Sequence, residues 1–380
     1  MPYTQADVFD YIGAEDVRFI RLSFCDTFGR QKNIAIMPSE LERAFRDGIS
    51  FDASAIAGFT DVTASDLFLI PDPATLSVLP WRSAEGKVVR LFCNIAHPDG
   101  TPFARDCRRL LADTVAEAAK KGLRLRFGAE FEFYLFKTDA AGRPTREPFD
   151  NAGYMDMAPA DCCENIRRDI CLSLLDMDIR PESSHHEEGP GQNEIDFRYS
   201  DALTVADDAL KFYSLVEATA AHYGACADFS PKPLADRAGN GMHINISVRA
   251  ANGSDLMMPF MAGILTHIRE ITAFLNTTDA SYARLGNWKA PHWVTWSAEN
   301  RSQLIRIPAA RGEYRRLEVR SPDPAANPYV AFAALIRAGL DGVTRQLEPP
   351  AAVDLDLFHI PESIQALSPA RRTASSRLRG

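Results

Sequence analysis

The 380-residue sequence has several informative absences. It contains seven cysteines but no Cys-x-x-Cys spacing, and no apolar run is long enough to cross a membrane. Its first residues, MPYTQADVFDYIG, are acidic and lack the basic and apolar regions of a secretory signal peptide. We therefore expect a cytoplasmic protein whose thiols are reduced.

Excess positive charge and phosphate-binding loops are also missing. The formal net charge is −9, which disfavours general binding to nucleic acid or to anionic membranes. No G-x-x-x-x-G-K-[ST] motif occurs, and no G-x-G-x-x-G segment opens a helix. If the protein binds a nucleotide, groups other than a helix N-terminus must hold its phosphates.

The pattern of the chain predicts two domains. Residues 16–96 alternate mostly as strands and turns, and the segment AHPDGTPFARD is rich in Pro, Gly and Asp, so we expect domains at 1–100 and 101–380. Strands precede and alternate with helices without regular βαβ units, which favours an α+β fold. The basic tail SPARRTASSRLRG is expected to be mobile. Helices are predicted at 106–121, 161–178, 204–223, 257–275 and 327–345.

Four predicted strands each carry a polar face, because residues i and i+2 of a strand point to the same side. Any one such strand is typical of a half-solvated sheet. These four, however, carry carboxylates and imidazoles with no lysine between them, and so predict one trough lined with carboxylates. The residues that share these faces are Glu130 and Glu132; His243, Asn245 and Ser247; Arg316, Glu318 and Arg320; and, in the hairpin SSHHEEGPGQNEIDFRY, His185 with Glu187 and Glu194 with Asp196 and Arg198.

The composition of this trough indicates a class of metal. Carboxylates with one or two imidazoles suit hard divalent cations such as magnesium or manganese, whereas zinc would call for more His or Cys. Five carboxylates exceed the needs of one magnesium ion, which keeps several of its waters. The sequence therefore predicts two ions in one site.

Arginines follow the acidic strands in the segment ENRSQLIRIPAARGEYRRLEVRSPDP, residues 299–324. Arg306 lies between two isoleucines and Arg320 lies two residues after Glu318, whereas Arg311 and Arg315 suit a solvated basic face. Arginine binds phosphate and carboxylate through two parallel hydrogen bonds. Divalent metals beside clustered arginines predict a polyphosphate substrate.

Five segments resemble, in order, the signature blocks of the type I glutamine synthetase family. They are FGAEFEFYLF, HHEEGPGQNEIDFRYSDAL, GMHINIS, NRSQLIRIP and LEVRSPDPAANPYVAFAALIRAGLDG, and the resemblance extends from about residue 16 to residue 345. It implies a small N-terminal β-grasp domain and a larger catalytic α+β domain with a curved antiparallel sheet, a fold shared with guanidino kinases. It also implies a homo-oligomeric ring with active sites between subunits.

The same resemblance implies the reaction. The γ-carboxylate of glutamate attacks the γ-phosphate of ATP and forms γ-glutamyl phosphate, with magnesium or manganese as the metal. An amine then displaces phosphate and leaves an amide. A carboxylate and a triphosphate repel each other, so metals and arginines must neutralise both before transfer.

Roles for single residues also follow from the resemblance. Glu132, Glu187 and Glu194 would hold the first metal, and Glu130, His243 and Glu318 the second. Arg301, Arg306 and Arg316 would contact phosphates, with Tyr199, Asn245 and Ser247 near the nucleotide. Gly239, Arg284 and Arg320 would position glutamate. Asp52 would reach into a neighbouring subunit's site, beside Tyr154 and Glu187, where the amine binds; the expected catalytic residues are Asp52, Arg284, Arg301 and Lys289.

The sequence departs from the family near the amine. Lys289, in SYARLGNWKAPHW, stands where the family carries a flap Glu, and Ala55 stands where it usually has a Ser. Fixed positive charge disfavours ammonium, and the added apolar surface suits an amine that carries carbon. Four interpretations stay open: a glutamate–ammonia ligase, a glutamate–organic amine ligase, a non-catalytic assembly or regulatory protein, and a guanidino kinase, which the amine-site residues Asp52 and Tyr154 disfavour. Lys289 as a solvated loop lysine is a further possibility.

Overall fold

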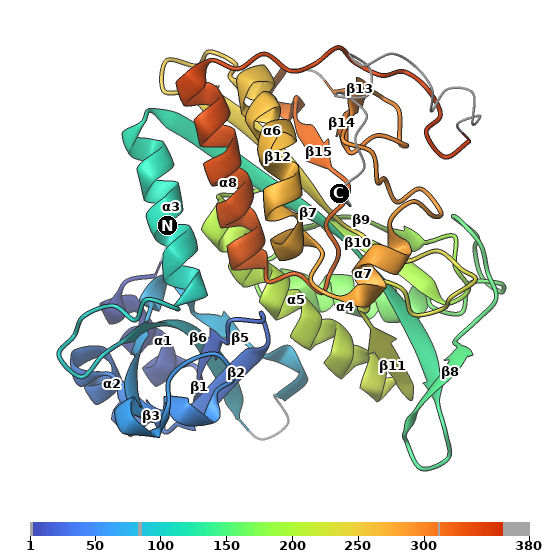
Figure 1. Cartoon of the computed structure of the whole chain (residues 1–380). Helices are drawn as coiled ribbons and strands as arrows, with labels where there is room; N and C mark the ends of the chain where they lie inside the picture. Colours follow the sequence, from blue (N-terminus) through green and yellow to red (C-terminus); the bar gives the residue numbers. More distant parts are fainter. Residues whose placement is uncertain (1–2, 83–85, 311, 360–380) are drawn as a thin grey trace.

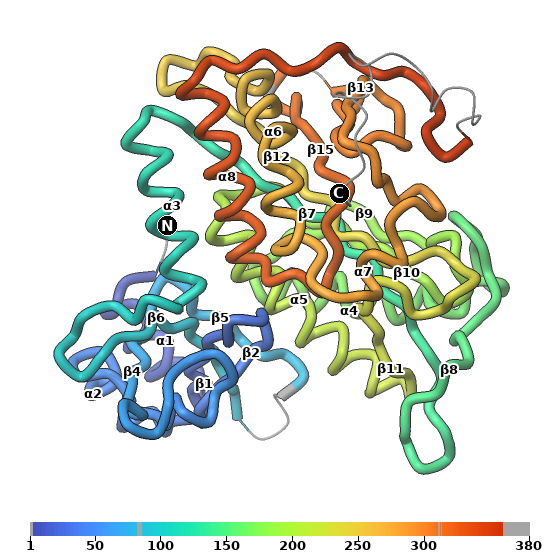
Figure 2. The backbone as a smooth tube through the Cα atoms, in the orientation of Figure 1, coloured from blue at the N-terminus to red at the C-terminus, as the bar shows by residue number. Residues whose placement is uncertain are grey.

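The computed structural model describes residues 3–82, 86–310 and 312–359. A small N-terminal lobe is joined to a larger lobe through helix α3 (Cys107–Lys120), which rises from one onto the other (Figures 1 and 2). The basic tail that we expected to be mobile lies outside the described residues. No helix among the described residues combines the length and apolar character needed to cross a membrane.

The small lobe contains a six-stranded sheet. Its path runs β2-β1-β6-β4-β3, with β5 pairing to β6, and the central pair β1 and β6 is parallel. Helices α1 (Gln5–Ala14) and α2 (Leu41–Asp47) accompany it and were not predicted; α1 begins at a capping box formed by Thr4 and Asp7. The strands are β1 (Val17–Cys25), β2 (Gln31–Ile36), β3 (Ile49–Asp52), β4 (Asp66–Pro71), β5 (Ser77–Val78) and β6 (Lys87–Ala96).

The helices of the larger lobe lie close to their predicted positions. The helix predicted at 257–275 has those bounds, and Asn327 is the N-cap of the last long helix because its side chain accepts from the Tyr329 amide. Short α7 (Asp279–Arg284) was not predicted. The others are α4 (Glu164–Asp176), α5 (Ala202–His222), α6 (Met257–Leu275) and α8 (Pro328–Arg345).

A nine-stranded, mostly antiparallel sheet forms the centre of the larger lobe. Its path runs β13-β14-β15-β12-β7-β10-β9, and β8 and β11 also pair with the long strand β7. The strands are β7 (Leu123–Thr138), β8 (Pro144–Pro148), β9 (Pro181–His186), β10 (Gln192–Phe197), β11 (Ala225–Asp228), β12 (Met242–Ala250), β13 (Trp296–Ala298), β14 (Ile305–Ile307) and β15 (Leu317–Val319).

Register brings the polar faces of four strands together. Glu130 lies opposite His243 on one side and opposite Asp196 on the other, and Glu132 lies opposite Glu194. Directly opposed residues have their side chains on the same face of a sheet. The alternation that each strand shows separately therefore becomes one continuous acidic face.

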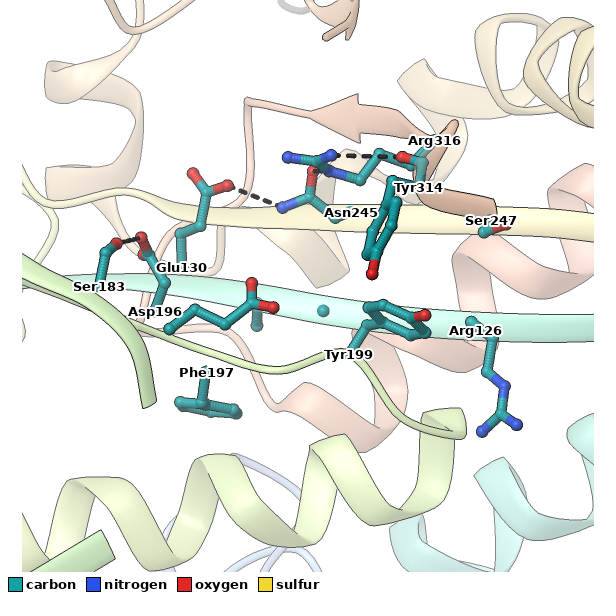
Figure 3. A pocket seen from close by; sticks show the side chains of 13 residues that line it. Arg126, Glu130, Ser183, Asp196, Phe197, Tyr199, Asn245, Ser247, Tyr314 and Arg316 are labelled. Atoms are coloured by element: carbon teal, nitrogen blue, oxygen red, sulfur yellow. Dashed lines mark hydrogen bonds between the residues drawn. The ribbon is translucent and has the colours of Figure 1, made fainter. Parts of the chain in front are cut away.

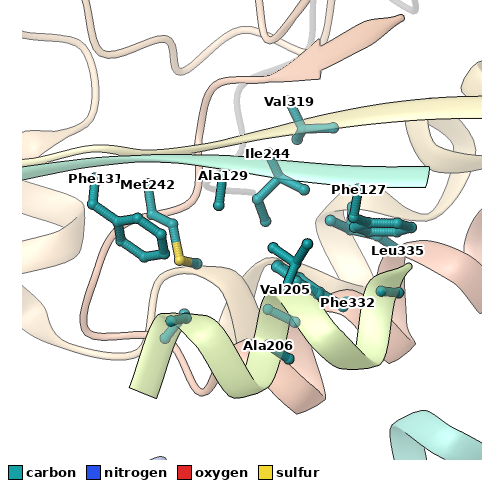
Figure 4. Close-up of a cluster of buried hydrophobic side chains, with 14 of the residues drawn as sticks. Phe127, Ala129, Phe131, Val205, Ala206, Met242, Ile244, Val319, Phe332 and Leu335 are labelled. Carbon is teal, nitrogen blue, oxygen red and sulfur yellow. The ribbon is translucent and has the colours of Figure 1, made fainter. Parts of the chain in front are cut away.

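The opposite face of the sheet packs on helices. Phe127, Ala129 and Phe131 of β7 point, together with Ile244 of β12, toward α5 and α8 (Figure 4). Each large apolar side chain buried in this way contributes about 1.5–3 kcal/mol to stability. This packing gives the acidic face a rigid base.

A buried ion network connects the two lobes. The guanidinium of Arg108 on α3 donates through Nη2 to Asp72 after β4 and to Asp207 on α5, both at 2.9 Å. The hydroxyl of Tyr329 on α8 donates to the same Asp207 at 2.6 Å. Because Arg108 and Asp207 are almost fully buried, this network is a fixed joint between the lobes.

Candidate active site

The acidic face carries two overlapping groups of potential metal ligands. Glu130, His243 and Glu318 form one group and Glu132, Glu194 and His243 another, with the ligand atoms of each group within 4.8 Å of one another. His243 stands between them, with Nδ1 3.2 Å from Glu130 and Nε2 3.8 Å from Glu132. Glu130, His243 and Glu318, which we expected to hold one ion, thus lie together, whereas Glu132 and Glu194, expected with Glu187, form a group with His243 instead.

The hairpin between β9 and β10 closes this face from one end. His185 Nε2 lies 3.0 Å from Glu187 and 4.0 Å from Glu194, so these three residues form a further candidate ligand group. The turn requires glycine at position 189, because a Cβ there would lie 1.8 Å from the hydroxyl oxygen of Tyr134. The turn therefore packs directly on Tyr134 of β7, and Glu187, just before the turn, lies beside His185 and Glu194.

The electrostatics of the cluster fit bound cations. Burial and the charges of Asp196, Glu132, Glu130 and Glu187 raise the pKa of Glu194 well above its ordinary value. Burial, followed by the charge of Glu130, raises the pKa of Asp196 to about 7. Carboxylates held this close without a compensating cation oppose ionisation. Oxygen donors with one or two imidazoles match hard divalent ions, as the sequence predicted.

Glu130 shows the opposite effect within the same cluster. Burial raises its pKa, but the hydrogen bond and charge of His243, together with Asn245 and Arg320, outweigh burial and lower it to about 2. Asn245 Nδ2 donates to the Glu130 carboxylate at 2.8 Å. Glu130 therefore stays ionised and available as a ligand.

Arginines surround the acidic face on its other side. Arg306 and Arg320 both donate to Glu318, and Arg320 Nε also donates to the backbone oxygen of Arg301 at 3.1 Å. Arg316 Nε donates to Asn245 Oδ1 at 2.9 Å. All four arginines line the cavity above the acidic face. Arg306 and Arg320 thus differ from Arg315, which pairs with Asp255 and is exposed, as we expected.

A second cavity, of about 350 Å³, continues from the acidic face along β7 and β12 (Figure 3). Glu130, Asp196 and Arg316 line both cavities, so the two cavities adjoin each other. Tyr199 and Tyr314 meet edge to face with ring centroids 6.4 Å apart. The structure places Tyr199, Asn245 and Ser247, which we expected near a nucleotide, around this second cavity. Its aromatic walls can hold a planar ring.

The residues expected to bind an amino acid also line the acidic cavity, which holds about 370 Å³. Gly239 is in close contact with the chain, since a Cβ there would lie 2.3 Å from the Pro231 carbonyl oxygen. Arg284 is buried and donates to the Ser321 carbonyl at 2.9 Å, and burial lowers its pKa. Arg320 completes this group.

Tyr154 and Lys289 lie together at the cavity mouth. The Tyr154 ring packs edge-on against His185 with centroids 5.4 Å apart, and the Lys289 ammonium lies 5.4 Å from the Tyr154 ring centre. Asp52 is not brought to this mouth. It ends β3 in the small lobe, is exposed, and accepts a hydrogen bond from the Ser54 amide at 2.9 Å.

Several residues at the site received no role from the sequence. Asp196 was assigned only to the acidic face, yet it forms a ligand group with Glu130 and Glu194. Gln192 Nε2 donates to the Gly239 carbonyl at 3.1 Å, and Glu188 pairs with Lys289. The alternation along β10 places Asp196 on the acidic face and could have indicated it as a ligand. No local sequence pattern indicates a role for Gln192 or Glu188. Arg198 was expected on the same face but follows the end of β10 and is exposed.

Family models match most of the chain. The glutamine synthetase β-grasp domain matches residues 16–98, and the glutamine synthetase catalytic domain matches residues 104–379. These matches also support the small β-grasp lobe and the larger catalytic lobe described above.

Curated relatives and solved structures agree with the family models. The chain is 44% identical to glutamine synthetase of Methanosarcina mazei, over 94% of this chain and 83% of that protein, and 43% identical to glutamine synthetase of Clostridium saccharobutylicum, over 95% and 84%. Among solved structures, a GmaS–ADP complex has a TM-score of 0.84 at 30% identity, covering 95% of this chain and 86% of that chain. Plasmodium falciparum glutamine synthetase has a TM-score of 0.84 at 26% identity, covering 96% and 80%.

Proposed function

The chain belongs to the glutamine synthetase family and is an ATP-dependent carbon–nitrogen ligase that joins the γ-carboxylate of glutamate to an amine, and from this premise we propose how its residues divide the work and which amine it uses. Members of this family use ATP and divalent metal ions, and we propose magnesium or manganese here. The observation that carries the proposal is the convergence of six ligand residues on one face: Glu130, Glu132, Glu187, Glu194, His243 and Glu318.

In the first step, the γ-carboxylate oxygen of glutamate attacks the γ-phosphorus of ATP, and the bond to the bridging oxygen breaks to release ADP. We propose that Arg301, Arg306 and Arg316 neutralise the phosphate oxygens, since all three line the acidic cavity. Bound to the carboxylates and His243, the metal ions would supply further neutralisation of phosphate charge. The similar GmaS structure is a complex with ADP, which supports nucleotide binding by this fold, and we propose that the nucleotide binds in the cavity of Tyr199, Asn245 and Ser247.

Arg284, Arg320 and Gly239 would hold glutamate in the acidic cavity. Burial of the two guanidinium groups strengthens their attraction for a carboxylate because little water screens it. Glycine at position 239 lets the backbone pack closely on Pro231 and on the side chain of Arg284, where a Cβ would clash, and so helps to hold Arg284 in place. This arrangement aims the γ-carboxylate at the metal end.

In the second step, the amine nitrogen attacks the carbonyl carbon of γ-glutamyl phosphate, and phosphate leaves with the electron pair of the broken bond. The attacking amine must be neutral, so a carboxylate has to accept its proton. We propose that this carboxylate is supplied by Glu187 of the same chain or by Asp52 of a neighbouring subunit. Asp52 lies apart from the cavity of its own chain, which supports a homo-oligomeric ring with active sites between subunits. Separately, we propose that the boundary between the two domains lies near residue 100.

For the amine, we propose an organic amine rather than ammonium. Lys289 stands where the resemblance places the family's flap carboxylate, so that carboxylate is absent here even though the Lys289 charge is paired with Glu188, and Ala55 in the small lobe lacks the hydroxyl of the usual serine. Ammonium is the second candidate, because the relatives with higher sequence identity are named glutamine synthetase. A non-catalytic role is disfavoured, because a repelling set of buried carboxylates has no structural benefit.

One assay tests the proposal: phosphate release from ATP with glutamate and magnesium, measured with ammonium and with a set of organic amines. We expect release that depends on glutamate and is faster with an organic amine than with ammonium. Release with ammonium alone would support the second candidate. The absence of glutamate-dependent release with every amine would contradict a ligase. Lys289→Glu is expected to improve the use of ammonium.

A further inference from the structure

The mouth of the acidic cavity has a rim formed by Tyr154, Glu188, Trp288 and Lys289. Sequence alone presents Lys289 as a lone cation. In the structure its ammonium donates to the Glu188 carboxylate, which lies 101 residues away, and it also lies 5.4 Å from the Tyr154 ring centre. The rim therefore offers a paired ion and two aromatic side chains instead of a free positive charge.

Backbone and side-chain contacts hold Trp288 and Lys289 in place. Both residues adopt left-handed φ angles, +40° and +61°, which non-glycine residues keep only where surrounding contacts enforce them. The Lys232 ammonium lies 3.9 Å from the Trp288 ring centre, and the Lys289 carbonyl accepts from Arg320 Nη2 at 3.4 Å. The rim is thus attached to an arginine that we assign to glutamate binding.

Glu188 is likewise attached to the metal end of the site. Its amide donates to the carboxylate of Glu187 at 3.0 Å, so any movement of Glu188 disturbs a proposed metal ligand. Its side chain is 30% exposed and that of Lys289 is 49% exposed, so both can be reached by a substrate in the mouth. The pair joins the two walls of the entrance.

The charge of this rim selects among amines. A substituent that carries a second ammonium can form an ion pair with Glu188 only if it displaces Lys289. A substituent that carries a carboxylate can form an ion pair with Lys289 only if it displaces Glu188. Either exchange leaves one charged side chain without its partner, which is unfavourable. An uncharged hydrocarbon substituent leaves the pair intact and packs on Tyr154 and Trp288, which are each 47% exposed.

We propose that Glu188 and Lys289 together determine amine specificity, and that the enzyme uses primary monoamines with an uncharged apolar substituent. This inference rests on the proposed function. Neither diamines nor amino acids are then good substrates. Glu188 acts on specificity through its bond to Lys289 and takes no part in the chemistry.

Three amines of similar length test this proposal: propylamine, 1,3-diaminopropane and β-alanine differ mainly in the charge at the far end. We expect kcat/KM for propylamine to exceed both others by about tenfold, which corresponds to about 1.4 kcal/mol. Lys289→Met should raise the diamine-to-propylamine ratio by about two- to fivefold, as expected for a partly exposed ion pair. Glu188→Gln should raise the β-alanine-to-propylamine ratio similarly.

The exchanged variant, Glu188→Lys with Lys289→Glu, restores a neutral rim and should regain the preference for propylamine. Lys137→Met breaks an exposed ion pair with Glu147 away from the site and should leave every ratio unchanged. Ratios that do not move in either single variant, or a wild-type enzyme that prefers ammonium or a charged amine, would overturn the proposal.

Capture of the acyl phosphate by hydroxylamine separates this proposal from the function on which it rests. Hydroxamate formed from ATP and glutamate, combined with unchanged ratios, rejects the role of the rim and leaves the ligase intact. No hydroxamate in the wild-type enzyme or any variant rejects the ligase and the rim proposal with it.

Discussion

Removal of one buried carboxylate, Glu194→Gln, should stabilise the metal-free protein. Glu194 lies in ligand groups with Glu132 and His243 and with Glu130 and Asp196, and the ligand atoms within each group lie within 4.8 Å of one another. Two like charges at that distance repel by about 3.5 kcal/mol at an effective dielectric constant of about 20. Folding avoids this repulsion only by binding a proton, which also costs free energy near neutral pH.

We therefore expect the variant to unfold with a free energy about 1–3 kcal/mol higher than the wild type in the presence of a chelator. For a protein of this size that difference raises the midpoint of thermal unfolding by roughly 1–4 °C. Glutamine has nearly the same shape as glutamate, so packing around β10 is preserved. The gain comes from the lost charge alone.

Metal should reverse this order. A ligand present at about 1,000 times its dissociation constant stabilises the folded state by about 4.1 kcal/mol, and the wild type should gain this amount from magnesium or manganese. The variant lacks one carboxylate ligand and should gain less than about 1 kcal/mol at the same concentration. The wild type is then the more stable protein with metal, and the variant the more stable one without it.

Thermal unfolding of both proteins, with chelator and with each metal, measures whether metal reverses their order of stability. Glu117→Gln on the exposed side of α3 is the matched control and should change neither the midpoint nor the response to metal. A Glu194→Gln variant that is less stable than wild type in chelator, or that gains as much from metal, would refute this account of the cluster.

Three further predictions concern the effect of pH, the joint between the lobes and the sharing of the site between subunits. Asp196 has a pKa of about 7 in the folded protein, against 3.8 for an ordinary aspartate, so the native state holds one more proton than the unfolded state between these pH values. The stability of the metal-free protein should therefore fall as pH rises through this window, by up to about 1.4 kcal/mol per pH unit. Asp196→Asn should remove this pH dependence, which urea unfolding at several pH values measures. Arg108→Met should cost about 3–5 kcal/mol of stability because Asp207 is left buried without its cation, and adding Asp207→Asn should recover most of this loss; no recovery in chemical unfolding would argue against the ion network. Asp52→Asn and Glu132→Gln should each abolish phosphate release, whereas dissociating and reassembling the two variants together should restore part of it, since some sites then combine an intact residue from each subunit; failure to complement would contradict a shared site.

Local periodicity accounts for much of what could be predicted. Alternation in strands depends only on neighbouring residues, so the sequence correctly placed Glu130 with Glu132, His243 with Asn245, and Glu194 with Asp196 on common faces. Helix patterns are equally local, and the helix at 257–275 was predicted to the residue. The resemblance of five ordered segments to one family then supplied roles that no periodicity can assign.

Helices α1 and α2 were missed because short helices are determined as much by packing on the sheet as by their own sequence. The ion pair between Glu188 and Lys289 was missed because its members lie 101 residues apart and belong to segments without a regular pattern. From the sequence alone, Lys289 was interpreted as a free cation whose charge disfavours ammonium. The ion pair with Glu188 largely neutralises that charge.

The sequence by itself determined which side chains share a face of each strand, and hence that carboxylates and imidazoles would be exposed on one side of a sheet. Only the tertiary structure decided which strands are neighbours and in what register, and so which carboxylates share an ion and which remain close enough to repel. The physical reason is that a strand's alternation is set by bond geometry within a few residues, whereas pairing depends on the burial of apolar surface contributed by the whole chain.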